Sequence, residues 1–158
     1  MPLFMSAVAS ALALSTPASI TIDPLPFGQD VEPSAGFIAE HCTASEVREL
    51  DPATMPLATT SYRQVDCEGF DYFGGERRAE FVYADGALTH VWVLVEADEL
   101  DALQREFETA YGSPDHDTAD FAAFNARNTA IRRDVPEALY YSDAAAPLFQ
   151  QWFASTAQ

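Results

Sequence analysis

The stretch AEFVYADGALTHVWVLV, residues 79–95, decides the fold expected for this chain. Two largely apolar runs, 79–84 and 87–95, flank Asp85-Gly86, a pair typical of a type I′ turn because both of its positions take positive φ. The sequence therefore predicts a β-hairpin. Its expected register places Tyr83 opposite Leu88, Phe81 opposite His90, and Ala79 opposite Trp92.

Helical patterns lie on both sides of this hairpin. Apolar residues recur at helical spacing over residues 31–42 and 98–111, and again after Asp143. Gly112 and Pro114 end the second of these helices. A further short helical piece is expected to begin at Ser45 and to end before Pro52.

Further strands are predicted at residues 61–67, 121–125, 129–133 and 138–142, and the sequence contains no recognisable internal repeat. The expected fold is α+β, with an antiparallel sheet of about 4–6 strands and two or three helices packed mainly on one face. This order of elements is similar to that of small exported bacterial domains of the β-lactamase-inhibitor type. No sequence motif carries the similarity, so it implies a fold and no function.

The N-terminal segment is typical of a secretory signal peptide. Residues 1–14 are uncharged and mostly apolar, small residues follow up to Ala18, and the run is shorter than the roughly 20 apolar residues of a membrane span. We expect residues 1–18 to be a signal peptide and residues 19–158 to form a single α+β domain that is periplasmic or secreted. Because the first basic residue is Arg48, a buried helix over residues 3–14 and a misplaced start remain alternatives.

The chain has two cysteines, Cys42 and Cys67. In an oxidising compartment, such a pair in a small domain predicts one disulfide bond. The alternatives are a catalytic thiol, with His41 as its base, and a metal ligand. Both are disfavoured, because neighbouring residues on a helix point about 100° apart and because a metal needs more ligands at closer spacing.

Charge limits the classes of partner. Acidic residues number 25 against 8 basic ones, all of them arginine, and the net charge is −17. Such a chain repels nucleic acids and anionic membrane surfaces, since phosphate binding requires basic groups. The acidity indicates either a basic partner or metal, or a protein that is kept soluble by its charge.

The strongest candidate binding surface follows the second cysteine. Aromatic residues, three glycines and a double arginine lie together over residues 69–78, and arginine both pairs bidentately with carboxylates or phosphates and stacks on aromatic rings. The alternative is a strand pair that turns at Gly74-Gly75, with buried aromatics and internally paired arginines. The expected surface, which includes two residues of the hairpin, comprises Phe70, Tyr72, Phe73, Arg77, Arg78, His90 and Trp92.

Catalytic and metal motifs are weaker. The acidic loop Asp115–Asp120 lacks the glycine and the distal glutamate of a calcium-binding loop, and the chain has no nucleophile elbow, phosphate-binding loop or His-Glu-x-x-His motif. We therefore expect no cofactor, no metal and no catalytic residue. The predicted function is an exported, non-catalytic binding or inhibitor-like module for a protein or small-molecule ligand. A small periplasmic hydrolase using His90, Glu80 or Asp66, and an accessory envelope protein, are the alternatives.

Overall fold

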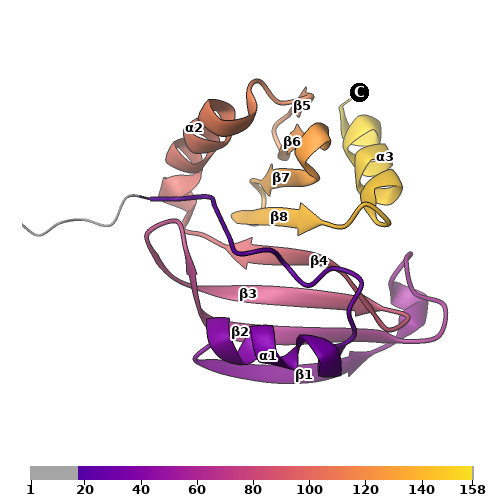
Figure 1. Ribbon diagram of the computed structural model, residues 1–158. Helices are drawn as coiled ribbons and strands as arrows, with labels where there is room; N and C mark the ends of the chain where they lie inside the picture. The colour runs from indigo at the N-terminus through magenta and orange to yellow at the C-terminus, as the bar shows by residue number, and fades with distance from the viewer. Residues whose placement is uncertain (1–17, 158) are drawn as a thin grey trace, which may run out of the picture.

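One antiparallel sheet organises the protein in the computed structural model, which describes residues 18–157. Its eight strands lie in the order β1-β2-β3-β4-β8-β7-β6-β5 (Figure 1). Three helices pack against it: α1 (Val31–His41), α2 (Leu100–Tyr111) and α3 (Ala146–Thr156). The strands are β1 (Ala44–Leu50), β2 (Tyr62–Tyr72), β3 (Gly75–Ala84), β4 (Ala87–Leu94), β5 (His116–Asp117), β6 (Phe121–Phe124), β7 (Thr129–Arg132) and β8 (Glu137–Tyr141). The signal peptide expected over residues 1–18 lies outside the described residues, apart from Ala18.

The same order of elements occurs twice. A helix followed by four strands makes up α1 to β4, and a helix followed by four strands makes up α2 to β8. The two halves meet where β4 pairs antiparallel with β8, from His90 opposite Tyr141 to Leu94 opposite Glu137. The sequence shows no repeat, so this correspondence is visible only in the structure.

The helices divide between the two faces of the sheet. Leu103 and Phe107 of α2 and Ile38 of α1 belong to the larger core, together with Ile20 of the extended lead-in that precedes α1. Phe149 and Phe153 of α3 form a second, smaller core on the opposite face, over β6 to β8. The expected fold class is therefore confirmed, with two helices on one face and the third on the other.

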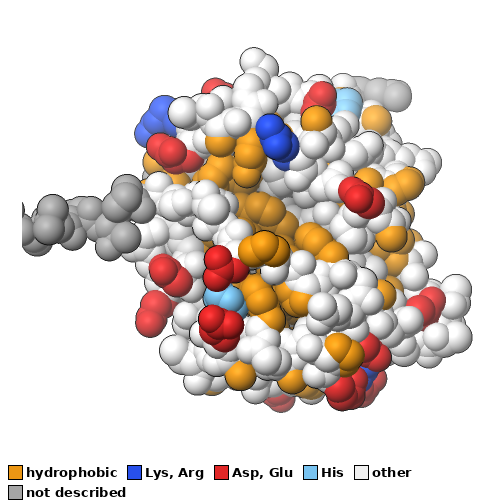
Figure 2. Space-filling view, in the orientation of Figure 1, with side chains coloured by type: hydrophobic (Ala, Val, Ile, Leu, Met, Phe, Trp, Pro, Cys, Tyr) orange, Lys and Arg blue, Asp and Glu red, His pale blue; other side chains and the backbone are white. Residues whose placement is uncertain are grey.

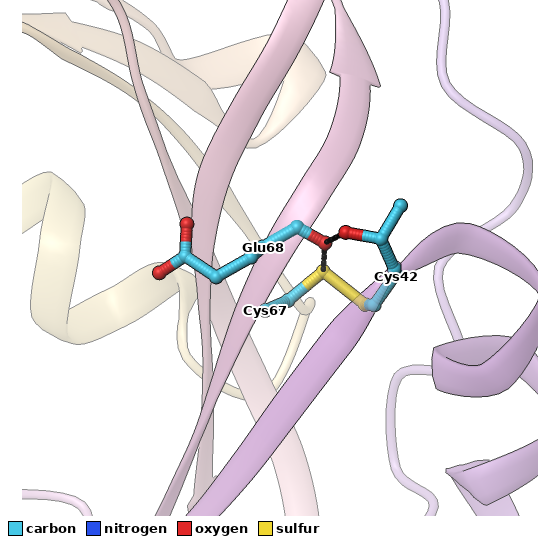
Figure 3. The surroundings of a disulfide bond; sticks show 4 residues. Cys42, Cys67 and Glu68 are labelled. Atoms are coloured by element: carbon cyan, nitrogen blue, oxygen red, sulfur yellow. Dashed lines mark hydrogen bonds between the residues drawn. A yellow bond between two sulfur atoms is a disulfide. The ribbon is translucent and has the colours of Figure 1, made fainter.

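Cys42 and Cys67 form the predicted disulfide bond, with their Cα atoms 5.4 Å apart (Figure 3). The bond ties the end of α1 to the middle of β2. Directly after it, the Thr43 amide donates to the carbonyl of Glu68 at 2.8 Å, and Ala44 pairs with Glu68. The chain therefore leaves the disulfide already aligned with β2.

This alignment explains an error in the sequence prediction. Residues 45–50 were expected to be helical, but they form β1, which pairs with β2 over seven residues. Pairing with β2 overrides the local helical signal. β1 and the two-residue β5 are the two edge strands of the sheet, and neither was predicted as a strand. They account for a sheet of eight strands where about 4–6 were expected.

The central hairpin forms at the predicted turn, but its register changes beyond the Tyr83–Leu88 pair. Asp85 and Gly86 both have positive φ, and Tyr83 lies opposite Leu88 as expected. The register then shifts by one residue at Thr89, so that His90 pairs with Val82 and not with Phe81. Because adjacent strand residues face opposite sides, this bulge moves His90 and Trp92 to the face opposite Phe81. They lie on the face of α3.

Over residues 18–157, no helix has both the length and the apolar character needed to cross a membrane.

Candidate functional site

The two phenylalanines and the tyrosine of the expected surface are buried. Phe70, Tyr72 and Phe73 all belong to the larger core. Arg77 makes a two-pronged ion pair with Glu99, both distances being 2.8 Å, and it also donates to the carbonyls of Tyr72 and Phe73. The arginine therefore holds the β2–β3 turn against the start of α2. This corrects the expectation of an exposed aromatic surface, since burial of the aromatic rings is more favourable than their exposure.

Arg78 lies in an ion-pair network on the opposite face. Its guanidinium is 3.1 Å from Asp66, whose carboxylate is also 2.8 Å from the Nε of Arg48 and accepts a hydrogen bond from Gln64. Burial opposes ionisation of this carboxyl, but the hydrogen bonds from Gln64 and Arg48 lower the pKa of Asp66 below its ordinary value. An ionised, paired carboxylate of this kind stabilises the fold and is a poor general acid.

His90 is also unsuited to acid–base chemistry. Its side chain is 3% exposed, and burial lowers the pKa of His90 to about 3. Its Nδ1 lies 2.9 Å from the hydroxyl of Thr89, and its ring packs edge-on against Phe149 at 4.9 Å. The imidazole is therefore neutral at ordinary pH and serves as a packing element beneath α3.

An apolar groove lies beside this packing. It runs between α3 and the β1–β2 connection and encloses about 500 Å³. We call it the aromatic groove; it is lined by Pro56, Leu148, Phe149, Gln151, Trp152 and Ser155. Trp152 is 36% exposed, although it packs against Phe121 at 4.6 Å. Of the seven predicted binding residues, His90 and Trp92 adjoin the groove through Phe149.

The groove is uncharged because of the two segments that form it. Residues 52–62 and 144–157 contain no acidic or basic side chain, in a chain that is 21% charged. Both tryptophans of the chain lie at this place, Trp152 in the wall and Trp92 against Phe149 with ring centroids 6.2 Å apart. The fold therefore brings two uncharged segments, distant in sequence, to one aromatic surface.

Asp85 anchors the wall opposite α3. Its carboxylate accepts hydrogen bonds from the backbone amides of Thr59, Thr60 and Ser61 at 2.7–3.0 Å, and from the hydroxyls of Thr59 and Thr60. These bonds, led by the one from the Thr60 amide, hold the pKa of Asp85 far below its ordinary value. The end of the β1–β2 connection, three residues after Pro56, is thus fixed to the hairpin turn.

A second hollow, of about 270 Å³, lies on the face seen in Figure 2, where hydrophobic side chains gather between the lead-in and α2. Ile22, Leu25 and Phe27 of the lead-in line it, together with Tyr111 and Tyr140. The Tyr140 hydroxyl donates to the carbonyl of Ile20 at 3.1 Å. This hollow is smaller, and its tyrosine fastens the lead-in to the sheet.

The acidic loop is occupied by structural contacts. Asp115 accepts a hydrogen bond from the Asn125 amide at 2.7 Å, and Asp117 lies 2.7 Å from Arg133. Over residues 18–157, no three His, Cys, Asp or Glu side chains are grouped so that they could hold a metal ion. The loop joins β5 to β6 and to the β7–β8 turn.

The fold and the groove define an α+β protein with a single antiparallel sheet, in which a neutral aromatic surface is set in an otherwise acidic chain. The chain matches no protein-family model, no curated protein and no solved structure.

Sequence reasoning identified the apolar side of α3 but not the groove. Leu148, Phe149 and Trp152 fit a helix that packs on the sheet, and nothing local indicates which segment faces them. The signal that could have found the groove is the absence of charge from both 52–62 and 144–157. Uncharged surface segments in an acidic chain suggest a shared contact surface.

Proposed function

We propose that this protein is an exported, non-catalytic binding module whose aromatic groove takes a small, uncharged, apolar molecule. The preformed, uncharged groove between α3 and the β1–β2 connection is the observation that carries the proposal. Its volume of about 500 Å³ falls in the roughly 300–1,000 Å³ range of small-molecule sites. A preformed site also avoids the entropic cost of ordering its walls when the ligand binds.

The lining of the groove determines the chemistry of the ligand. Phe149 and Trp152 offer aromatic faces, Leu148 and Pro56 add aliphatic contact, and none of the lining side chains is charged. A charged ligand would lose its hydration there without gaining a partner of opposite charge. The polar side chains of Gln151 and Ser155 provide hydrogen bonds that orient the ligand.

Two observations support the remaining parts of the proposal. A disulfide bond is compatible with an extracellular location, and together with the apolar leader it supports export to the periplasm or the medium. His90, the titratable side chain beneath the groove, is buried and uncharged at ordinary pH, which favours binding over hydrolysis.

Fluorescence of the purified, disulfide-bonded protein tests the binding. N-phenyl-1-naphthylamine, a neutral aromatic probe, should become fluorescent on titration and should quench Trp152 and Trp92. Trp152→Ala should weaken binding by about tenfold, the loss of one aromatic wall. Ser155→Phe should abolish binding by filling the groove from an exposed position. Ala110→Phe adds the same ring to the exposed surface of α2, and this control should leave the affinity unchanged.

Asp85→Ala tests whether the groove is preformed. Residue 85 is not part of the lining, yet its loss frees the amides of residues 59–61 and should weaken probe binding while the far-ultraviolet circular dichroism is retained. Two results would refute the proposal: saturable probe binding that is equally strong in Ser155→Phe, or no saturable binding by the unaltered protein.

A further inference from the structure

One edge of the sheet is open along its whole length. β1 pairs with β2 on its inner side, and among residues 18–157 no backbone hydrogen bond reaches its outer side. Most of its residues are exposed, and Val47 is 49% exposed. The opposite edge, β5, has only two residues. Long open edges are ready to pair with another strand, whereas very short ones are protected from such pairing.

The surroundings of β1 favour an occupant. On the face of α1, a hollow of about 160 Å³ lies between the helix and the strand, lined by apolar residues that include Ala35, Ile38, Val47 and Val65. An added strand would bring its own side chain over Val47 and cover part of this hollow. At the bottom of Figure 1, β1 is the outermost strand, with α1 in front of the sheet.

The sequence of β1 is complementary to itself. When two copies pair antiparallel about a two-fold axis normal to the sheet, opposed side chains must share a face, so the axis lies midway between the two copies of one residue. With the axis at Val47, Glu46 of each copy lies opposite Arg48 of the other. Ser45 then lies opposite Glu49, Ala44 opposite Leu50, and Val47 opposite its own counterpart. Every one of the seven residues of β1 is paired.

Neighbouring registers lack this complementarity. An axis at Glu46 sets the two glutamates against each other, and an axis at Arg48 does the same with the two arginines. Like charges in directly opposed positions destabilise a strand pair. Arg48 also keeps its contact with Asp66 in the favoured register, because that contact uses its Nε and Nη2 while the side chain is still 41% exposed.

We propose that β1 is a self-association edge, on which a second copy of this chain pairs antiparallel with Val47 at the two-fold axis. The two eight-stranded sheets then continue into one another. Each copy carries a net charge of −17, so the copies repel each other at long range, and salt promotes the association by screening this repulsion.

Charge exchange at two positions tests the proposed register. Sedimentation equilibrium of the full chain, at 150 mM and at 500 mM NaCl, should show a concentration-dependent dimer that is stronger at higher salt. Glu46→Arg and Arg48→Glu each place like charges opposite one another twice in the dimer. Each variant should lower the association constant by about tenfold or more. An equimolar mixture of the two variants should restore association, since arginines then face glutamates.

Glu106→Arg, the same change of charge on the exposed side of α2, should associate at least as well as the unaltered protein. Circular dichroism of each variant establishes that it is folded, and Glu46→Arg leaves the Arg48–Asp66 contact intact. A monomer at every concentration and salt overturns the proposal, as does a dimer that neither exchange weakens or a mixture that associates no better than its components. Trp152→Ala, which alters the aromatic groove, should leave the association constant of the dimer unchanged. The test of the dimer can therefore fail or succeed independently of the test of the groove.

Discussion

The hydroxyl of Tyr72, at the end of β2, lies 2.8 Å from the hydroxyl of Tyr140 on β8. Tyr140 gives its own proton to the carbonyl of Ile20, so Tyr72 is the donor in the bond between the two hydroxyls. Burial raises the pKa of Tyr72 and that of Tyr140, and both stay protonated at ordinary pH. This chain of bonds joins the two halves of the sheet to the lead-in.

Tyr140→Phe should therefore destabilise the protein. It removes both bonds and leaves the buried Tyr72 hydroxyl and the Ile20 carbonyl without their partner, a loss of about 1–3 kcal/mol in the free energy of unfolding. Urea unfolding measures the loss, and limited proteolysis should show earlier cleavage in the lead-in. Tyr111→Phe, at the neighbouring ring of the same hollow, is the matched control. Equal stability of the two variants would contradict the role assigned to the Tyr140 hydroxyl.

Removal of the disulfide should cost more. The double variant Cys42→Ala/Cys67→Ala opens a loop between residues 25 apart in sequence, which lowers the free energy of unfolding by about 3–4 kcal/mol in the chain-entropy model. Alanine avoids placing a hydroxyl at the buried position 67. In urea unfolding, the double variant and the reduced unaltered protein should have similar free energies of unfolding. A loss below about 1 kcal/mol would contradict the chain-entropy prediction for this loop.

Two glycine substitutions should have opposite effects. Gly36 lies on the exposed side of α1 with nothing near an added Cβ, so Gly36→Ala should stabilise the helix by about 0.5–1 kcal/mol. Gly69 has a φ of +74°, and an added Cβ would lie 2.6 Å from the Cγ2 of Thr43. Gly69→Ala should therefore destabilise the fold by about 2–4 kcal/mol. Thermal unfolding of both variants checks the two signs, and a neutral Gly69→Ala would be inconsistent with the left-handed backbone of residue 69 and its close approach to Thr43.

Glu137 should make stability fall as pH rises. Burial raises the pKa of Glu137 from an ordinary 4.5 to about 7, although Arg132, 3.1 Å away, opposes the shift. Since the folded state holds this proton more tightly, its contribution to stability is complete below pH 4.5 and is lost as the pH rises through 7.

Glu137→Gln should remove that dependence. Relative to the unaltered protein, the variant should gain about 2–3 kcal/mol between pH 4.5 and pH 8. Arg132 keeps its partner Asp134, at 2.7 Å. Urea unfolding at several pH values measures the difference, with the exposed Glu76→Gln as the control. A difference between Glu137→Gln and the unaltered protein that stays constant with pH would show that residue 137 does not titrate in this range.

The sequence predicted the elements whose signals are local. The Asp85-Gly86 turn, the helices around 31–41 and 100–111 and the strands β6 to β8 follow from turn chemistry and periodicity. β1 was mistaken for a helix because its partner β2 determines its conformation. The bulge at Thr89 has no sequence signature, yet this one residue decides the faces of His90 and Trp92.

The site was less predictable than the fold. Phe70, Tyr72 and Phe73 satisfied the pattern of a binding surface and of a buried turn equally well, and only their packing into the larger core, beneath α1 and α2, decided between the two. The groove forms only where the β1–β2 connection lies beside α3, and these two segments are far apart in the sequence. Composition marks each as uncharged, but spatial proximity cannot be inferred from one sequence.

The order of the strands also governs how the chain reaches this structure. In the described chain, six of the seven strand pairings join consecutive strands, and the β4–β8 pairing alone joins distant ones. The largest loss of chain entropy on loop closure therefore accompanies the β4–β8 pairing, which has five residue pairs. The other strand pairs form between neighbours in sequence. We expect the two four-stranded halves of the sheet to form quickly and independently. A slower step should follow, in which β4, the strand of His90 and Trp92, pairs with β8, the strand of Tyr140.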